Sequence, residues 1–483
     1  MKKIGFLNDK YIELEKKGIL ERKEKFEGKL YLEVGGKLLD DLHAKRVLPG
    51  FIPDNKIRIL ESLKDEIEVI VTVGQKAIES NKVRQDKGLT YSDETFNIIT
   101  SLEKRGILIN SIVINQYEKT PNTDKFILEA KTKGIKIYTH KKISGYPYDV
   151  DYVISEEGLG QNEYIETKRD IVLVIGPGPS SGKMSTCLSQ LYLDSKKGIK
   201  SGYAKLELFP IWNLPVEHMV NIAYEAATVD LADKVMIDPM YLSKYNKIAT
   251  SYNRDVELFP ILDTLLTKIY GERIYNSPTD MGVNYAGDCI SSDEIVVKAS
   301  KIEIIRRYLK AIYEEKYENG NSNDTQLLKG LLNKAQIDIF EDEVVAKVDK
   351  TKNTKNRDNC LILLETGEEF VGVEQDNISA FAVCILNVLE SKLELKKDTL
   401  FCPKMIENIL KYKKQTEDIE SQKIEAVDCI LAFAILQDKN EIYKQAIQEL
   451  PIFKYARLHS SKVISKSDIQ LAKKLKIDST FIC

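Results

Sequence analysis

Short apolar runs alternate with helix-like stretches through the first 175 residues. The runs are Lys29 to Val34, Ile67 to Val73, Ile107 to Asn115, Ile135 to Tyr138, Val150 to Ser155 and Ile171 to Ile175. Asp93 to Arg105 and Lys119 to Lys133 lie between runs and have apolar residues at helical spacing. Strands that alternate with helices usually form a parallel sheet. The pattern predicts an α/β domain over residues 1–214, with an open, mostly parallel sheet that is P-loop-like or Rossmann-like.

The pattern changes after residue 214. Apolar residues now recur at three and four positions, as in Leu262, Leu265 and Ile269, which is typical of amphipathic helices. We therefore expect a mostly helical domain over residues 215–337. Its tract Tyr317 to Thr325 is polar and contains glycine, so we predict a mobile loop there.

The last third of the chain predicts a small α/β domain over residues 338–483. Two apolar runs, Leu361 to Leu364 and Phe370 to Val373, are separated by a turn at Thr366-Gly367. This arrangement indicates a β-hairpin. The apolar stretch Ile378 to Leu389 follows and favours a helix.

A glycine-rich segment follows the apolar run Ile171 to Ile175. Glycines without Cβ atoms let backbone N–H groups turn inward, the N-terminus of a following helix adds partial positive charge, and Lys183 adds a full charge. Together these parts are what a phosphate group needs, although a purely structural glycine turn is the alternative. The residues expected to bind a phosphorylated cofactor here are Gly176, Gly178, Ser180, Ser181, Gly182, Lys183, Met184 and Ser185.

This segment departs from the G-x-x-x-x-G-K-[ST] motif at two positions. Pro177 replaces the first glycine, and Met184 replaces the hydroxyl that would bind magnesium. Ser185 or Thr186 supplies that hydroxyl if the helix begins slightly later. Asp238 follows three apolar residues and is a second candidate for binding Mg²⁺, with a helix cap as the alternative.

A second polar segment follows the first apolar run. Gly35, Gly36 and Lys37 come directly after that run. The carboxyl ends of parallel strands meet at one edge of a sheet, so we expect these residues to lie close to the glycine-rich turn. The alternative is a charged helix with ordinary surface ion pairs.

Two polar segments interrupt the predicted helical region and supply further catalytic candidates beside Lys183. Arg254 offers fixed donors for a phosphate or carboxylate, and Asp280 offers a carboxylate for a cation or substrate. The alternative is that such side chains cap neighbouring helices.

Composition excludes several classes of partner. The chain has 71 basic and 74 acidic side chains among 483 residues, so no field of one sign would attract nucleic acid or an anionic membrane. Its seven cysteines form no CxxC pair, and its four histidines lack the spacing of zinc ligands. With no apolar stretch of about 18 residues, we expect a cytoplasmic protein with reduced thiols.

Longer strings resemble a bacterial family known only as a domain of unknown function. They include GPGPSSGKMSTCLSQLYLD, YAKLELFPIWNLP and SPTDMGVNYAGDCI, and the resemblance extends nearly from end to end. It implies a P-loop-like domain, a helical domain and a further α/β domain, and it brings no established substrate. The family's loop usually has glycine where this chain has Ser180.

Two functions from different classes fit these features. The first is an enzyme that binds ATP, another nucleotide or another phosphorylated small molecule, with magnesium-dependent phosphoryl transfer or hydrolysis. The second is a non-catalytic sensor or scaffold protein whose glycine turn is structural. Either class is compatible with a homo-oligomer, and magnesium-dependent turnover separates the two.

Overall fold

A computed structural model describes residues 4–84, 88–416 and 423–482 of the chain. The chain folds into two compact units, one over Ile4–Ser300 and the other from Lys301 onward. Helix α13 (Asp293–Tyr317) runs through this boundary. The division into three domains at residues 214 and 337 stays a prediction.

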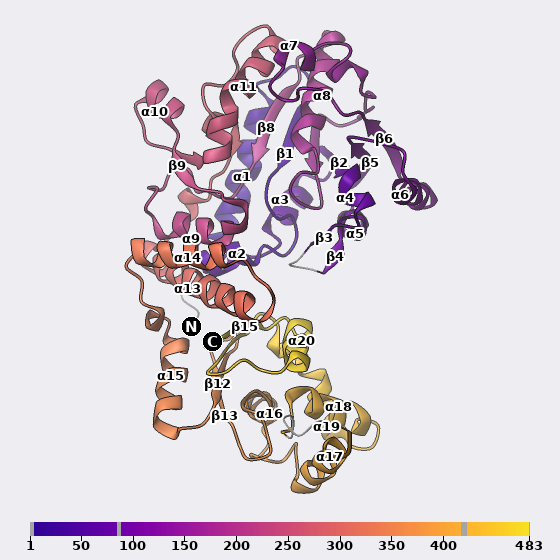
Figure 1. The fold of residues 1–483 in the computed structure, drawn as a ribbon. Coiled ribbons are helices and arrows are strands. Elements are labelled where there is room, and N and C mark those ends of the chain that lie inside the picture. The colour runs from indigo at the N-terminus through magenta and orange to yellow at the C-terminus, as the bar shows by residue number, and fades with distance from the viewer. Residues whose placement is uncertain (1–3, 85–87, 417–422, 483) are drawn as a thin grey trace. The chain divides into compact units, whose positions relative to one another are not determined.

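The first unit is built on a parallel sheet. Among the described residues the sheet has seven strands in the order β11-β8-β1-β7-β2-β5-β6, and every neighbouring pair is parallel. Figure 1 labels β8, β1, β2, β5 and β6 of this sheet from left to right. The strands are β1 (Leu30–Val34), β2 (Ile67–Gly74), β5 (Leu108–Asn115), β6 (Lys136–His140), β7 (Ile171–Ile175), β8 (Gly202–Leu206) and β11 (Gly282–Val283). The predicted α/β class with a largely parallel sheet is confirmed.

Helices follow most of these strands. The helices of the first unit are α1 (Asn8–Lys23), α2 (Leu42–Val47), α3 (Asn55–Ser62), α4 (Gln75–Glu79), α5 (Tyr91–Glu103), α6 (Pro121–Thr132), α7 (Val150–Val153), α8 (Lys183–Lys196), α9 (Met219–Ala227), α10 (Pro239–Tyr245), α11 (Asn253–Tyr270) and α12 (Pro278–Met281). Two small antiparallel pairs join β3 (Val83–Arg84) to β4 (Leu89–Thr90) and β9 (Val235–Ile237) to β10 (Thr250–Tyr252).

The core of the first unit positions α8 and α11 against one face of the sheet. Tyr31 of β1 and Val172 of β7 are fully buried in one cluster with Leu188 of α8 and Leu262 of α11. Alternate strand residues point to the same face, so β1 also directs Glu33 toward these helices. A carboxylate thus lies beside an apolar core.

Two elements differ from the sequence-based expectation. Val150–Val153 is a short helix rather than a strand, because the Asp149 side chain accepts a hydrogen bond from the Tyr152 N–H and caps it. The loop within the polar tract Tyr317 to Thr325 is shorter than predicted. Helix α14 already begins at Ser322, because Asn321 caps it.

The second unit contains a four-stranded sheet in the described part of the chain, in the order β13-β12-β14-β15. The hairpin of β12 (Asn359–Leu363) and β13 (Glu369–Val373) is antiparallel, as predicted. The other strands are β14 (Arg457–Ser460) and β15 (Asp478–Phe481), and the helices are α14 (Ser322–Lys334), α15 (Glu343–Lys355), α16 (Ala380–Lys392), α17 (Pro403–Thr416), α18 (Ala426–Leu436), α19 (Glu441–Gln448) and α20 (Lys466–Lys474).

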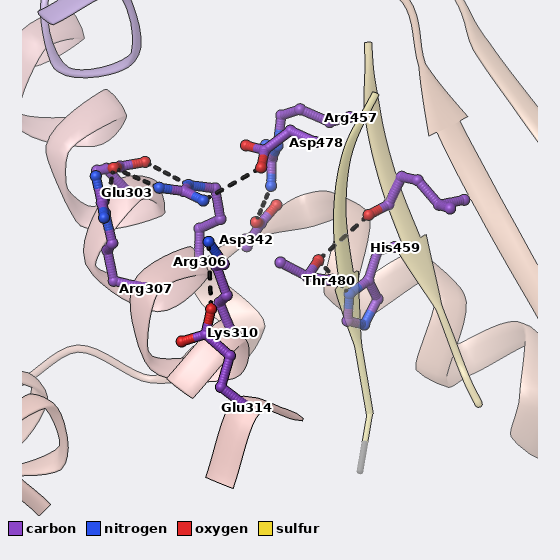
Figure 2. Close-up of polar contacts among 11 residues, drawn as sticks. Glu303, Arg306, Arg307, Lys310, Glu314, Asp342, Arg457, His459, Asp478 and Thr480 are labelled. Atoms are coloured by element: carbon purple, nitrogen blue, oxygen red, sulfur yellow. Dashed lines mark hydrogen bonds and ion pairs between the residues drawn. The ribbon is translucent and has the colours of Figure 1, made fainter. Parts of the chain in front are cut away.

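A buried ion-pair network ties α13 to the strands of the second unit. Figure 2 shows the Arg306 guanidinium between the carboxylates of Glu303 and Asp478. Nε of Arg306 lies 2.6 Å from Oε2 of Glu303, and its Nη1 lies 3.2 Å from Oδ1 of Asp478. The Arg306 side chain is 5% exposed and that of Glu303 is fully buried. Arg457 of β14 pairs with Asp342 in the same region (Figure 2). Buried charges are tolerated only when they are paired in this way.

Replacing Arg306 with alanine should therefore destabilise the second unit strongly. The variant leaves the Asp478 carboxylate without this partner, so we expect a loss of about 3 kcal/mol in the free energy of unfolding. Lys347→Ala is the matched control, since its ion pair with Glu369 is exposed and should contribute less than about 1 kcal/mol. Urea unfolding of both variants measures the difference, and equal losses would contradict this account.

Candidate phosphate-binding site

The glycine-rich turn lies between a buried strand and a helix. Ile171–Ile175 forms β7, and α8 begins at Lys183 after the left-handed residue Gly182. The predicted strand and the predicted start of the helix are both confirmed. The turn therefore leaves the carboxyl end of β7, where open parallel sheets bind their ligands.

Side chains from other segments hold the turn. Asn115, at the end of β5, donates from Nδ2 to the Ser181 carbonyl at 3.1 Å and to the Thr186 hydroxyl at 3.2 Å. Arg84 donates to the Pro177 carbonyl at 2.9 Å. These contacts come from two separate segments and hold the backbone of the turn at Pro177 and Ser181.

Backbone geometry explains the small residues of the turn. Ser180 has a φ of 60° and Gly182 a φ of 87°, both in the left-handed region that favours glycine. A Cβ atom at Gly178 would lie 2.5 Å from the Tyr91 hydroxyl. Ser180 therefore stands at a position where its own backbone conformation would suit glycine better.

The N-terminus of α8 has no side-chain cap among the described residues. The first N–H groups of an α-helix lack partners within the helix, and the helix dipole places partial positive charge there. The Ser185 hydroxyl donates to the Gly182 carbonyl at 3.0 Å, and the Thr186 hydroxyl contacts Asn115. The Ser185 hydroxyl uses its proton in this bond and keeps its oxygen lone pairs, whereas the Thr186 hydroxyl is fully buried.

Lys183 forms an ion pair across the carboxyl edge of the sheet. Its Nζ lies 3.9 Å from Oε1 of Glu33, and the lysine side chain is 16% exposed. The other carboxylate oxygen of Glu33 accepts a hydrogen bond of 2.9 Å from the Tyr203 hydroxyl. The charge of Lys183 is therefore partly compensated by a carboxylate that sequence analysis missed.

A second group of charges continues the site on β8. Lys205 is the register neighbour of Glu33, and its Nζ lies 2.6 Å from Asp255 and 2.7 Å from Glu207. Burial raises the pKa of Glu207 to about 7, although the ion pair with Lys205 opposes this shift. A carboxyl group with such a pKa is suited to proton transfer near neutral pH.

The predicted segment after β1 lies at the same edge as the turn. Leu30 pairs with Ile171 in parallel register, so Gly35 and the start of the turn leave adjacent strands. Lys56 donates to the Gly35 carbonyl at 2.7 Å, and burial lowers the pKa of this lysine. The backbone of Gly35 therefore has a basic partner that the sequence pattern did not indicate.

The remaining candidates have local partners. Arg254 forms a two-pronged ion pair with Asp233, at 2.6 Å and 2.8 Å. Asp280 accepts hydrogen bonds from the Tyr245 hydroxyl at 2.9 Å and from the Asn276 N–H at 3.0 Å. Both side chains thus have partners within the region around α11 and α12, and their roles toward a ligand stay predictions.

Asp238 caps helix α10. Its carboxylate accepts hydrogen bonds from the N–H groups of Met240 and Tyr241, both at 3.0 Å, and from the Thr279 hydroxyl. The alternative interpretation of Asp238 as a helix cap is confirmed. Within the described ranges, the structure brings together no group of three His, Cys, Asp or Glu side chains that could hold a metal ion.

The structure adds four charged residues to the sequence-based site: Glu33, Lys205, Glu207 and Asp255. Glu33 and Lys205 are charged residues within otherwise uncharged strands. A charged residue in a buried strand is unusual, and this is the signal by which the sequence could have indicated both residues. Their pairing depends on the register of β1 and β8, which the sequence pattern does not give. In the described part of the chain, no helix is both long and apolar enough to span a membrane.

Fold and site together define an α/β protein with a parallel sheet and a glycine turn at its carboxyl edge. Two family models match the chain: "Domain of unknown function DUF1846, N-terminal" over residues 4–336 and "Domain of unknown function DUF1846, C-terminal" over residues 341–481. The chain belongs to the DUF1846 family.

Similar proteins extend over the whole chain. A "UPF0371 protein" of Streptococcus pneumoniae (strain Hungary19A-6) is 40% identical over 483 residues, covering 100% of this chain and 98% of the relative. The "UPF0371 protein str1377" of Streptococcus thermophilus (strain CNRZ 1066) is 41% identical with the same coverage. These relatives support the predicted family and carry no named substrate.

Replacing Gly182 with alanine should disrupt the turn. A Cβ atom there would lie 2.4 Å from Cγ of Asn115, which itself holds the turn, and the backbone is left-handed. Gly198→Ala is the matched control, because Gly198 is also left-handed with open space around it. We expect the control to lose about 1 kcal/mol and Gly182→Ala at least about 2 kcal/mol more in urea unfolding. Similar losses would mean that the turn tolerates a side chain.

Proposed function

We propose that this protein binds the phosphate group of a small molecule, such as ATP, another nucleotide or another phosphate ester, at residues 176–185. The observation that carries the proposal is the uncapped N-terminus of α8 at the carboxyl edge of the parallel sheet, beside Lys183. The site then resembles P-loop-like and Rossmann-like sites in its use of a strand, a glycine turn and a helix.

The contacts of the turn support this proposal. The N–H groups at the start of α8 are donors, and the helix dipole and Lys183 supply positive charge. Asn115 and Arg84 hold the loop, so little ordering is needed when the anion binds. Such preorganisation would lower the entropic cost of binding a phosphate group.

A reaction at this site would be phosphoryl transfer or hydrolysis. Lys183 would stabilise developing negative charge, and Glu207 would accept or donate a proton. Mg²⁺ would supply further charge stabilisation when bound through a hydroxyl of the turn. Arg254 and Asp280 would join only after leaving their present partners.

Ligand binding and turnover are tested separately. A thermal-shift screen with inorganic phosphate, ATP, ADP, GTP and phosphosugars, with and without Mg²⁺, identifies the ligand, because saturation at about 100 times Kd stabilises by about 2.7 kcal/mol. Release of inorganic phosphate from the best ligand then tests catalysis. Binding without turnover would favour a sensor or scaffold, and no stabilisation by any phosphate compound would contradict the proposal.

Lys183→Ala should weaken phosphate binding at least about tenfold, which corresponds to about 1.4 kcal/mol. Lys196→Ala, at the exposed C-terminal end of the same helix, is the control and should leave the affinity unchanged. Calorimetry with the ligand from the screen measures both. Unchanged affinity in Lys183→Ala would show that the lysine only neutralises Glu33.

Glu33→Gln should strengthen phosphate binding, in contrast to Lys183→Ala. The glutamine removes a negative charge 3.9 Å from Lys183, keeps the shape of the side chain and still accepts from Tyr203. We therefore expect inorganic phosphate to bind more tightly, by about threefold or more, at low ionic strength. A weaker affinity in Glu33→Gln would mean that Glu33 positions Lys183 for the ligand rather than competing for it.

A further inference from the structure

An apolar pocket of about 310 Å³ lies between α8, α11 and the segment Tyr146–Tyr148. It is lined by Tyr146, Pro147, Tyr148, Met184, Leu188, Leu258, Ile261, Leu262 and Leu265. Ligand pockets begin at roughly this size, about 300 Å³. The pocket is therefore large enough for part of a small molecule.

The pocket directly adjoins the proposed phosphate site. Met184 is the second residue of α8, so its N–H belongs to the uncapped helix start while its side chain lines the pocket. On α11, Leu258 lies one turn after Asp255, which pairs with Lys205. A ligand whose phosphate binds at the turn would thus have this pocket within reach.

The lining side chains determine what fits. They are aliphatic or aromatic, and the phenol hydroxyls of Tyr146 and Tyr148 are the polar side-chain groups among the residues that line the pocket. A nucleobase or a sugar would bury several polar atoms without partners there, at a cost of about 1–3 kcal/mol for each. A hydrocarbon group would lose no hydrogen bond and would gain about 0.8 kcal/mol for each buried methylene.

We propose that the ligand is a phosphate ester of a hydrocarbon group, with its phosphate at residues 176–185 and its alkyl or isoprenoid chain in the pocket between α8 and α11. This inference rests on the proposed phosphate site and narrows its ligand from phosphorylated molecules in general to those with an apolar body. Residues 176–185 then bind the phosphate group, and the pocket selects for the hydrocarbon group attached to it.

A chain-length series tests the inference on the full-length protein. Calorimetry with inorganic phosphate, methyl phosphate, butyl phosphate and hexyl phosphate should show Kd falling about fourfold for each added methylene until the pocket is full. AMP and glucose 6-phosphate, as polar comparators, should bind no more tightly than methyl phosphate. Inorganic phosphate has no hydrocarbon group, so its Kd measures binding at residues 176–185 alone.

Two variants test whether the alkyl chain of the ligand binds in the pocket. Ile261→Trp, at a partly exposed position, should fill the pocket and remove the chain-length dependence while leaving the affinity for inorganic phosphate unchanged. Leu258→Gln should weaken the binding of hexyl phosphate and leave the binding of inorganic phosphate unchanged. This variant serves as a second test if Ile261→Trp does not fold. Leu128→Trp, an exposed position on α6, is the matched control and should behave as the unmodified protein.

The outcomes separate the two proposals. If inorganic phosphate binds and the Kd of the alkyl phosphates does not depend on chain length, the proposal of a hydrocarbon ligand is wrong. The proposed phosphate site would be unaffected by this result. Tighter binding of AMP than of butyl phosphate would also overturn the proposal of a hydrocarbon ligand, since a nucleobase would then occupy the pocket. No binding of any phosphate compound would refute the phosphate site itself.

Discussion

Parallel pairing of β1 with β7 and β8 is the constraint on which the site depends. It brings the carboxyl ends of three strands, distant in sequence, to one edge of the sheet. Glu33, the glycine turn and Lys205 consequently lie side by side. A shift of one residue in the register of β1 would turn Glu33 to the opposite face and break its pairing with Lys183.

Charges at this edge are close to balanced. Lys183 pairs with Glu33, and Lys205 lies between Asp255 and Glu207. Charges withdrawn from water are costly, so each is kept only because a partner of opposite sign is close. An incoming anion must therefore compete with carboxylates already present. If the proposed site binds phosphate, a ligand with contacts beyond its phosphate group would overcome this competition more readily than phosphate alone.

The sequence predicted the local parts of this site well. The strand β7, the glycine turn and the start of α8 are contiguous, and their signals are an apolar run, small residues and a helix-compatible stretch. The same holds for the hairpin of β12 and β13, where a turn separates two apolar runs. In each case the chemistry of neighbouring residues decides the conformation.

Long-range contacts were beyond the sequence pattern. The ion pair of Lys183 with Glu33 joins residues 150 positions apart, and it exists because two strands pair in one register. Val150–Val153 looked like a strand, since a short apolar run has no period that separates strand from helix, and the Asp149 cap decided the outcome. The pairing of Arg254 with Asp233 is likewise not visible in the sequence pattern, and a ligand role for Arg254 stays a prediction.

Occupancy of the turn by an anion is the central claim, and a crystal structure grown with inorganic phosphate or tungstate tests it most directly. The account predicts electron density for the anion within hydrogen-bond distance of the N–H groups at the start of α8, with Lys183 Nζ drawn from Glu33 toward it. Tungstate gives an anomalous signal that distinguishes the anion from water. An empty turn at a concentration where calorimetry shows saturation, with the anion bound elsewhere, would contradict the account.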